Sequence, residues 1–320
     1  MGDNGWPQIV VVGAGAVGSY FGGMLARAGA PVTLVGREQH VEAVSHHGLY
    51  IDSMDFQQYV TISATSEVSA ARKANFVLFC VKTYDNEQAA QTLAADLTPG
   101  AVVVSLQNGV DNVERIRSAA RIEAVAAVVY VAVAIAGPGR VKHSGRGDLI
   151  IGNLLRDGPN RQADLDACAK LFARAGIPCR ISENIEAELW TKMIINCAYN
   201  AISALGRAKY ARLAQNPWTR DLMIRVTEEA LAVAGAAGVN LPETNIVEDV
   251  LQIAETMSGA MSSTAQDIAR GRRTEIDSLN GYLVRRGAEV GVAMPVNQTL
   301  HALVKLLEET AAGPGPVSNA

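Results

Sequence analysis

The 320-residue chain lacks the sequence features typical of metal-binding, membrane-spanning and nucleic-acid-binding proteins. Its four cysteines and five histidines are scattered, with no Cys-x-x-Cys pair and no histidine at metal-ligand spacing, so we expect no metal site. Its apolar runs are short or interrupted by lysine and asparagine, which argues against membrane spans. A net charge of −4 without a continuous basic stripe predicts no nucleic-acid partner. Because the first five residues lead directly into an apolar stretch, we expect no signal peptide and a soluble, cytoplasmic protein.

The composition that remains is that of a globular protein with two domains. Hydrophobic residues make up 49% of the chain and charged residues 19%, values typical of packed cores rather than of disorder. The length suits two domains better than one. Residues 1–183 alternate between strand and helix patterns, which predicts an α/β domain with a mostly parallel, doubly wound sheet and helices on both faces. From residue 184 onward apolar positions recur at helical spacing, which predicts an all-helical domain over 184–320, with 311–320 as a loose tail.

The expected elements follow from these patterns. The first domain should contain strands at 8–12, 31–35, 75–81, 101–106, 124–134, 141–143, 149–151 and 177–181, a hairpin insertion over 48–62, and helices at 16–29, 86–96 and 163–175. The second should contain helices at about 186–206, 217–237, 243–257, 262–270, 274–290 and 296–309.

Residues 8–37 carry the pattern that points to a ligand. Gly13, Gly15 and Gly18 supply the spacing G-x-G-x-x-G between a predicted strand and a predicted helix, and a second strand follows. The first glycine permits a tight turn, the second lets a pyrophosphate approach the backbone, and the third lets helix and strand pack closely. The helix N-terminus would then face the phosphates with unpaired N–H groups. A glycine-rich turn alone can match this spacing, but the β-α-β context favours a dinucleotide cofactor.

Arg37 indicates which dinucleotide this is. The residue that ends the second strand meets the adenosine ribose, where an Asp or Glu would bind both free hydroxyls. A guanidinium suits a 2′-phosphate instead, so we expect NADPH rather than NADH. The alternative is that Arg37 is an ordinary solvated arginine.

Polar residues also follow two strands and line one helix. Lys82 and Asn108 come after predicted strands, at the edge where an open α/β sheet binds its ligand. An Asn-Gly pair is equally typical of a plain turn, and Lys82 of a protein surface. Lys192, Asn196 and Asn200 are four residues apart and share one face of the helix at 186–206. Because buried amides and amines without partners are costly, this polar stripe faces either solvent or a cleft between the domains.

A third polar segment covers residues 262–277. Its polar members include Ser263 and Glu275. Taken alone, Ser262 and Ser263 are typical of a helix N-cap, and Glu275 is typical of an acid in the first turn of a helix.

Together these segments resemble the ketopantoate reductase (2-dehydropantoate 2-reductase) family over nearly the whole chain. The resemblance lies in Gly13-Ala14-Gly15-Ala16-Val17-Gly18, Val81-Lys82-Thr83, Gln107-Asn108-Gly109, and residues 189–200 and 262–277, of which the last two are the most family-specific. It implies an oxidoreductase with a Rossmann-type NADP-binding domain over 1–183 and a helical substrate and catalytic domain over 184–320. The implied reaction is the NADPH-dependent reduction of the 2-keto group of ketopantoate to D-pantoate, a step toward pantothenate and coenzyme A.

The resemblance also implies a role for each site residue. Lys192 corresponds to the general acid and Glu275 to the carboxylate that orients the substrate. The substrate-contacting positions are Asn108, Asn196, Asn200 and Ser263. The cofactor-binding positions are Gly13, Ala14, Gly15, Ala16, Val17, Gly18, Arg37, Lys82 and Asn108.

Other functions stay open. Paralogues that reduce other 2-keto acids resemble the same family. β-Hydroxyacid and polyol-phosphate dehydrogenases also join a nucleotide domain to a helical one, but their lysine lies in glycine-rich surroundings that are absent around Lys192. A non-catalytic NADPH-binding regulator would bind cofactor without turnover, and the intact set Lys192, Asn196 and Glu275 argues against it. The apolar helices of the second domain permit a homodimer without requiring one.

Overall fold

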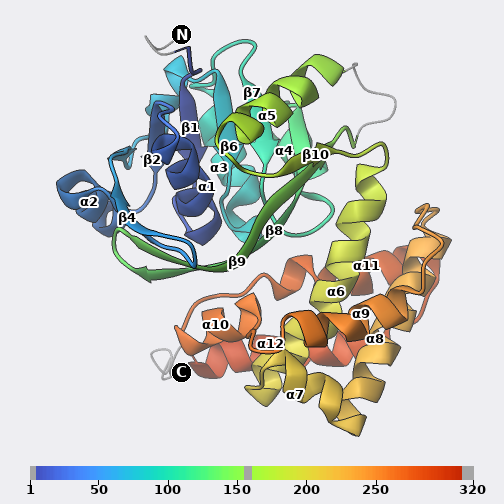
Figure 1. Cartoon of the computed structure of the whole chain (residues 1–320). Helices are drawn as coiled ribbons and strands as arrows, with labels where there is room; N and C mark the ends of the chain where they lie inside the picture. The colour runs from blue at the N-terminus through green and yellow to red at the C-terminus, as the bar shows by residue number, and fades with distance from the viewer. Residues whose placement is uncertain (1–4, 155–160, 312–320) are drawn as a thin grey trace, which may run out of the picture. The chain divides into compact units, whose positions relative to one another are not determined.

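The computed structural model of the protein describes residues 5–154 and 161–311. The chain divides into two compact units, residues 1–185 and 186–320. The first unit is built on a sheet and the second is helical (Figure 1). The tail expected at 311–320 lies outside the described residues, apart from Ala311 at the end of the last helix.

The first unit contains a ten-stranded sheet with the order β4-β3-β9-β8-β7-β6-β1-β2-β5, and β10 pairs with β9. The run from β5 to β8 is parallel throughout, as predicted. Every residue of β1, β6 and β7 is buried, because helices cover both faces of a parallel sheet. The parallel strands are β1 (Ile9–Val12), β2 (Val32–Val35), β5 (Ser63–Thr65), β6 (Phe76–Phe79), β7 (Val102–Ser105) and the start of β8 (Ala124–Gly137).

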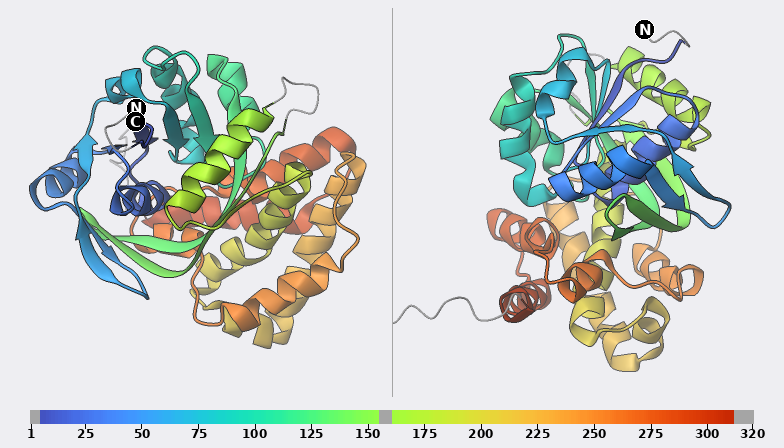
Figure 2. Two further views of the ribbon diagram at one scale, coloured as in Figure 1. Left: turned by 45° about the horizontal axis from the view of Figure 1, so that its top comes forward. Right: turned by 90° about the vertical axis from the view of Figure 1, so that its left-hand side faces the viewer.

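Side chains alternate between the two faces of this sheet, and each face has its own helices. One core cluster joins Ile9 and Val11 of β1 to Phe21 of α1 (Ala16–Arg27) and Phe172 of α5 (Gln162–Arg174). Helices α3 (Asn86–Ala94) and α4 (Asn112–Ala120) pack together outside this cluster. In the right-hand view of Figure 2 the teal and blue helices lie on opposite sides of the sheet. The doubly wound architecture is therefore confirmed.

One prediction for the sheet is wrong in detail, and another is right but incomplete. The strands expected at 141–143 and 149–151 are a single strand, β9 (Arg140–Gly152), which runs antiparallel to β8. The Ser-Gly-Arg-Gly segment between them looks like a turn in the sequence, but its residues Gly145 (φ 151°) and Gly147 (φ 149°) accommodate register shifts within the strand. The predicted hairpin is present as β3 (Leu49–Asp52) and β4 (Gln57–Val60), and β3 also pairs with β9, so that the hairpin extends the main sheet.

Helix α2 (Glu38–His47) and helix α4 were not predicted. Helix α2 buries only His40 and Val44, so its sequence shows little of the apolar repeat that marks a helix. The short 3₁₀ segments η1 (Val68–Lys73) and η2 (Thr83–Asp85) complete the connections. Strand β10 (Cys179–Ile181) follows α5 as expected and precedes the helical unit.

The second unit consists of helices. These are α6 (Ile185–Gly206), α7 (Tyr210–Gln215), α8 (Pro217–Ala236), α9 (Ile246–Thr256), α10 (Ser263–Ala269), α11 (Asn280–Val290) and α12 (Pro295–Ala311). The short helix α7 was not predicted. The single helix expected at 274–290 is wrong, because a 3₁₀ turn, η3 (Ile276–Ser278), is separated from α11 by Leu279 with φ −112° and ψ −104°. Hydrogen bonds to α12 hold this segment out of helical conformation, as described below.

Among residues 5–154 and 161–311, no helix combines the length and the apolar character needed to cross a membrane.

Candidate active site

The glycine-rich turn joins β1 to α1, at the point where the strand order reverses. Strand β1 has β2 on one side and β6 on the other, and a parallel sheet of this kind binds ligands at the carboxyl ends of its strands at such a switch point. The N–H groups of Gly13 and Ala14 donate to Val35 O at 3.0 and 2.9 Å. These bonds attach the turn to the end of β2, so that the turn has a fixed place at this edge.

The three glycines of the turn differ in what surrounds them. Gly13 has a φ of +102°, and a Cβ there would lie 2.7 Å from the backbone of Cys80. A Cβ on Gly18 would lie 2.2 Å from Gly13 O, so this glycine allows helix and turn to pack closely. An added Cβ on Gly15, by contrast, would meet no atom within 4 Å among residues 5–154 and 161–311, its own chain neighbours aside. Packing within the protein therefore explains Gly13 and Gly18 but not Gly15, whose open surroundings suit a phosphate held against the backbone at a helix N-terminus.

Arg37 is the N-cap residue of α2 and is exposed. The preceding residue, Gly36, packs against the turn, since a Cβ there would lie 2.7 Å from Ala14 Cβ. Arg37 therefore follows the point at which β2 meets the glycine-rich turn.

Lys82 and Asn108 lie in the loops after β6 and β7, which are adjacent parallel strands. Two buried amide side chains hold these loops, and one of them, Asn112, was not marked by any sequence pattern. Gln107 Nε2 donates to Val81 O at 3.1 Å, and Asn112 Nδ2 donates to Asn108 O at 2.6 Å. The carbonyl group before Lys82 and the carbonyl group of Asn108 itself are thus held by buried amides.

Arg115 of α4 adds a charged contact to the same loops. Its guanidinium donates to Thr83 O at 2.7 Å and to both carboxylate oxygens of Glu87 at 2.7 and 2.9 Å. The hydrogen bond from Arg115 is the main cause of a lowered pKa of the Glu87 carboxyl. Nothing in the sequence marks Arg115, because its partners lie 28 and 32 residues away.

In the helical unit, α6 carries the predicted polar stripe. Lys192 and Asn196 are half-buried and Asn200 is buried, so the stripe becomes less accessible along the helix. Asn200 Nδ2 donates to Ser263 Oγ at 3.5 Å, and Ser262 Oγ donates to Asn200 O at 3.1 Å. The structure therefore brings two of the predicted residues, Asn200 and Ser263, into contact. Ser262 is the N-cap of α10, because it accepts from Ala265 N, while Ser263 is exposed.

Glu275 is 9% exposed and is the N-cap residue of η3, so the prediction of a first-turn helical acid is wrong. Its neighbour Thr274 donates to Glu308 Oε1 of α12 through its N–H at 2.7 Å and through Oγ1 at 2.5 Å. On the other side Asp277 accepts from His301 at 2.8 Å and from Lys305 at 3.1 Å. These bonds anchor the segment 274–277 to α12 and account for its departure from a regular helix.

The charge of Asp277 is strongly stabilised. Burial raises the pKa of this carboxyl, but the hydrogen bonds from His301 and Lys305 outweigh the burial and lower the pKa to about 2. Asp277 is therefore an anion at any physiological pH.

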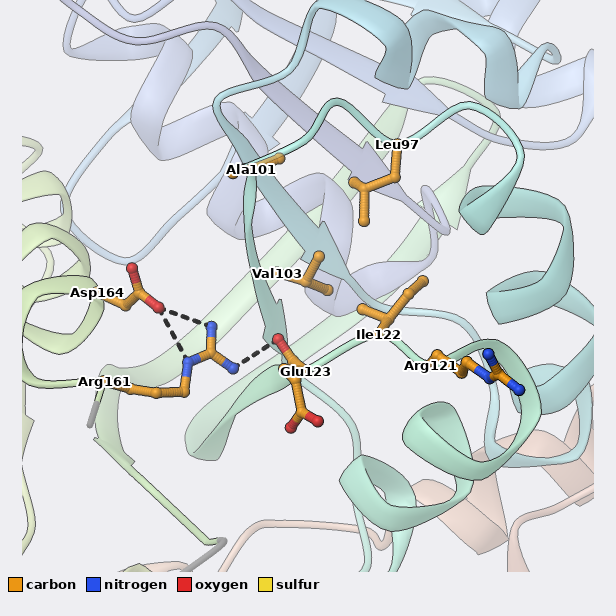
Figure 3. A pocket seen from close by; sticks show the side chains of 9 residues that line it. Leu97, Ala101, Val103, Arg121, Ile122, Glu123, Arg161 and Asp164 are labelled. Carbon is orange, nitrogen blue, oxygen red and sulfur yellow. Dashed lines mark hydrogen bonds and ion pairs between the residues drawn. The ribbon is translucent and has the colours of Figure 1, made fainter. Parts of the chain in front are cut away.

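A cavity of about 360 Å³ lies in the first unit (Figure 3). It is at the edge of the sheet opposite to the one that carries the glycine-rich turn. It is lined by Ala101 and Val103 at the start of β7 and by Ile122 before β8, which are amino ends of parallel strands. Arg161 at its wall is already paired with Asp164 at 2.9 Å. This cavity is therefore not at the edge of the sheet where the cofactor is predicted to bind.

The fold and the site together define a class. An open, doubly wound sheet with G-x-G-x-x-G at its switch point is a Rossmann-type dinucleotide-binding domain, here followed by an all-helical unit with a polar stripe on its first helix.

Comparison with known families identifies the group within this class. The family model described as "Ketopantoate reductase PanE/ApbA" matches residues 9–156, and the model described as "Ketopantoate reductase PanE/ApbA C terminal" matches residues 184–308. A 2-dehydropantoate 2-reductase from Pyrococcus horikoshii is 32% identical over 306 residues, which are 96% of this chain and 99% of that protein. The chain belongs to the ketopantoate reductase family, PanE/ApbA.

Solved structures agree with this assignment. The crystal structure of a PanE/ApbA family ketopantoate reductase from Ralstonia eutropha JMP134 is 47% identical, with a TM-score of 0.88 and coverage of 95% of this chain and 99% of that chain. The ternary structure of D-mandelate dehydrogenase with NADH and anilino(oxo)acetate is 25% identical, with a TM-score of 0.87 over 95% of this chain and 99% of that chain.

Proposed function

We propose that this protein reduces the 2-keto group of 2-dehydropantoate to D-pantoate with NADPH as the hydride donor. Family membership supports the reaction. The strongest support from the molecule itself is that every polar residue implied by the family resemblance is present, with Asn200 and Ser263 in contact in the helical unit. In this proposal the first unit binds the cofactor and the second supplies the groups that act on the keto acid.

The residues present fit a nicotinamide dinucleotide. The open space over Gly15 and the N-terminus of α1 would receive the pyrophosphate, and Arg37 would bind the 2′-phosphate. Lys82 and Asn108, on loops held by buried amides, would contact the cofactor, and Asn108 the substrate as well. When bound, the nicotinamide would supply the hydride.

The helical unit would supply the proton and the orientation. Negative charge grows on the carbonyl oxygen as the carbonyl carbon is reduced, and the ammonium group of Lys192 stabilises this charge and donates a proton to it. Asn196 and Asn200 orient substrate oxygens as neutral donors. Ser263 hydrogen-bonds the substrate carboxylate or hydroxyl, and Glu275 orients the substrate.

A panel of 2-keto acids, assayed by the loss of NADPH absorbance, tests this function. We expect 2-dehydropantoate to give the highest kcat/KM. Aryl 2-keto acids belong in the panel because D-mandelate dehydrogenase has a similar structure. A higher kcat/KM for an aryl or another branched 2-keto acid would move the protein to another specificity within the family. Cofactor binding without turnover of any keto acid would favour the regulator instead. Light scattering tests separately whether the protein is a homodimer.

A further inference from the structure

A series of hydrogen bonds runs from the β8–β9 turn through α2 to the glycine-rich turn. The N–H of Gly139 donates to His40 Nδ1 at 3.1 Å. His40 Nε2 lies 3.1 Å from Ser19 Oγ, and Ser19 Oγ donates to Ala14 O at 3.2 Å. Ser19 is 0% exposed and His40 9% exposed, so these bonds are shielded from water. They join residues that lie up to 99 positions apart.

The partners determine the tautomer of His40. A backbone N–H can only donate, so Nδ1 must accept from Gly139 and carries no hydrogen. Ser19 Oγ uses its hydrogen for Ala14 O and must therefore accept from His40 Nε2. The ring is thus neutral, with its hydrogen on Nε2, and burial lowers the pKa of His40 in the direction that keeps it neutral.

These hydrogen bonds end on the part of the glycine-rich turn that has open surroundings. The carbonyl group of Ala14 and the N–H of Gly15 belong to one planar trans peptide group, in which they point in opposite directions. A hydroxyl that holds Ala14 O therefore also fixes the direction of the Gly15 N–H. Apart from its own chain neighbours, no atom of the described residues lies within 4 Å of an added Cβ on Gly15, so this is where a ligand can approach the backbone.

His40 also lies beside the other predicted cofactor residue. Its backbone N–H donates to Arg37 O at 3.0 Å, so its side chain extends from the first turn of the helix that Arg37 caps. The same imidazole thus connects the turn at Ala14 to the helix that begins after Arg37.

We propose that Ser19 and His40 are positioning residues for the cofactor. His40 orients the Ser19 hydroxyl, and that hydroxyl holds the Ala14–Gly15 peptide group with its N–H directed toward the cofactor phosphates. This inference rests on the proposed function only in that the glycine-rich turn binds the nicotinamide dinucleotide. The identity of the keto acid plays no part in it.

Two substitutions of His40 separate its two hydrogen bonds. In His40→Gln the side-chain amide nitrogen lies near the place of Nε2 and can still donate to Ser19. In His40→Asn the amide oxygen lies near the place of Nδ1 and can accept from Gly139 but cannot reach Ser19. Ser19→Ala removes the bond to Ala14 O directly and adds no bulk.

The experiment is a titration of the purified full chain with NADPH, followed by nicotinamide fluorescence, together with steady-state kinetics. Because a net hydrogen bond is worth about 0.5–1.5 kcal/mol, we expect Ser19→Ala and His40→Asn to raise the Kd for NADPH by about 3- to 10-fold. His40→Gln should stay within about twofold of wild type, and kcat at saturating NADPH should change little in all three. His47→Gln, at the exposed end of the same helix, is the matched control and should bind as wild type does.

Thermal melting of each variant separates positioning from simple stability. A purely structural His40 would give lowered Tm values in both His40 variants with unchanged Kd, and that result would overturn the proposal. An equal loss of affinity in His40→Gln and His40→Asn, or wild-type affinity in Ser19→Ala, would overturn it too. A wild-type protein that binds NADPH but does not reduce 2-dehydropantoate would contradict the proposed function and leave this test intact.

Discussion

Glu308 of α12 holds Thr274, the residue before Glu275, through two hydrogen bonds. One carboxylate oxygen, Oε1, accepts both the N–H and the hydroxyl of Thr274, at 2.7 and 2.5 Å. Thr274 is 1% exposed, so no water can replace this partner. Because Glu275 is the next residue, the position of its carboxylate depends on a contact made 34 residues further along the chain.

This contact predicts a different result for each of two substitutions of Glu308. Glu308→Ala leaves a buried N–H unsatisfied, which costs about 1–3 kcal/mol and lets the segment shift. We expect a KM for the keto acid raised by at least about fivefold with a smaller change in kcat. Glu308→Gln keeps an accepting oxygen and should restore a KM near wild type, and Glu309→Ala on the exposed side is the control. Equal KM values in all three would show that Glu308 does not position Glu275.

Lys192→Ala tests the general acid. Removing one donor that stabilises the transition state costs on the order of 100- to 1000-fold in turnover, and we expect a loss of at least about 100-fold. The affinity for NADPH should stay near wild type, because the proposed cofactor groups belong to the other unit. Turnover is measured at saturating NADPH and affinity by fluorescence titration. Lys209→Ala, an exposed lysine in the same unit, should be unaffected. Wild-type turnover in Lys192→Ala would refute the assignment.

Arg37→Ala tests the preference for NADPH. Hydrogen bonds to charged groups are worth about 1.5–3 kcal/mol, so the KM for NADPH should rise by about tenfold or more. The KM for NADH should hardly change, since NADH lacks the 2′-phosphate, and it serves as the internal control. A clear preference for NADH that persists in Arg37→Ala would contradict the NADPH assignment.

The lowered pKa of Asp277 predicts how the stability of the fold depends on pH. Its pKa in the folded protein is about 2, below the ordinary value of 3.8. The carboxylate therefore contributes its full stability above about pH 4, and this contribution is lost as the pH falls from there through about 2. Screening by solvent reduces this contribution to stability, because 34% of the Asp277 side chain is exposed.

Urea unfolding of wild type and Asp277→Asn over this pH range measures the effect. We expect the variant to be less stable near neutral pH and the difference to shrink toward pH 2. A difference that does not depend on pH would show that the carboxylate charge is not what stabilises this segment.

Local patterns in the sequence predicted much of this protein, for identifiable reasons. The glycine spacing at Gly13, Gly15 and Gly18 encodes backbone conformations that few other residues can adopt, so it located the turn and its neighbouring strand and helix. The four-residue spacing of Lys192, Asn196 and Asn200 likewise placed them on one face of α6, because a helix repeats every 3.6 residues. The catalytic and binding roles of these residues are still predictions.

Only the tertiary structure decided the rest, because it depends on contacts between distant segments. The continuous β9 forms because β3 and β8 pair with it on either side, although its own residues look like two short strands and a turn. The helix expected at 274–290 is broken because Thr274 and Asp277 are held by side chains of α12. No pattern in the sequence marks His40, because its partner Gly139 lies 99 positions further along the chain. Short-range periodicity determines which face a side chain occupies, and long-range packing determines which atoms it meets there.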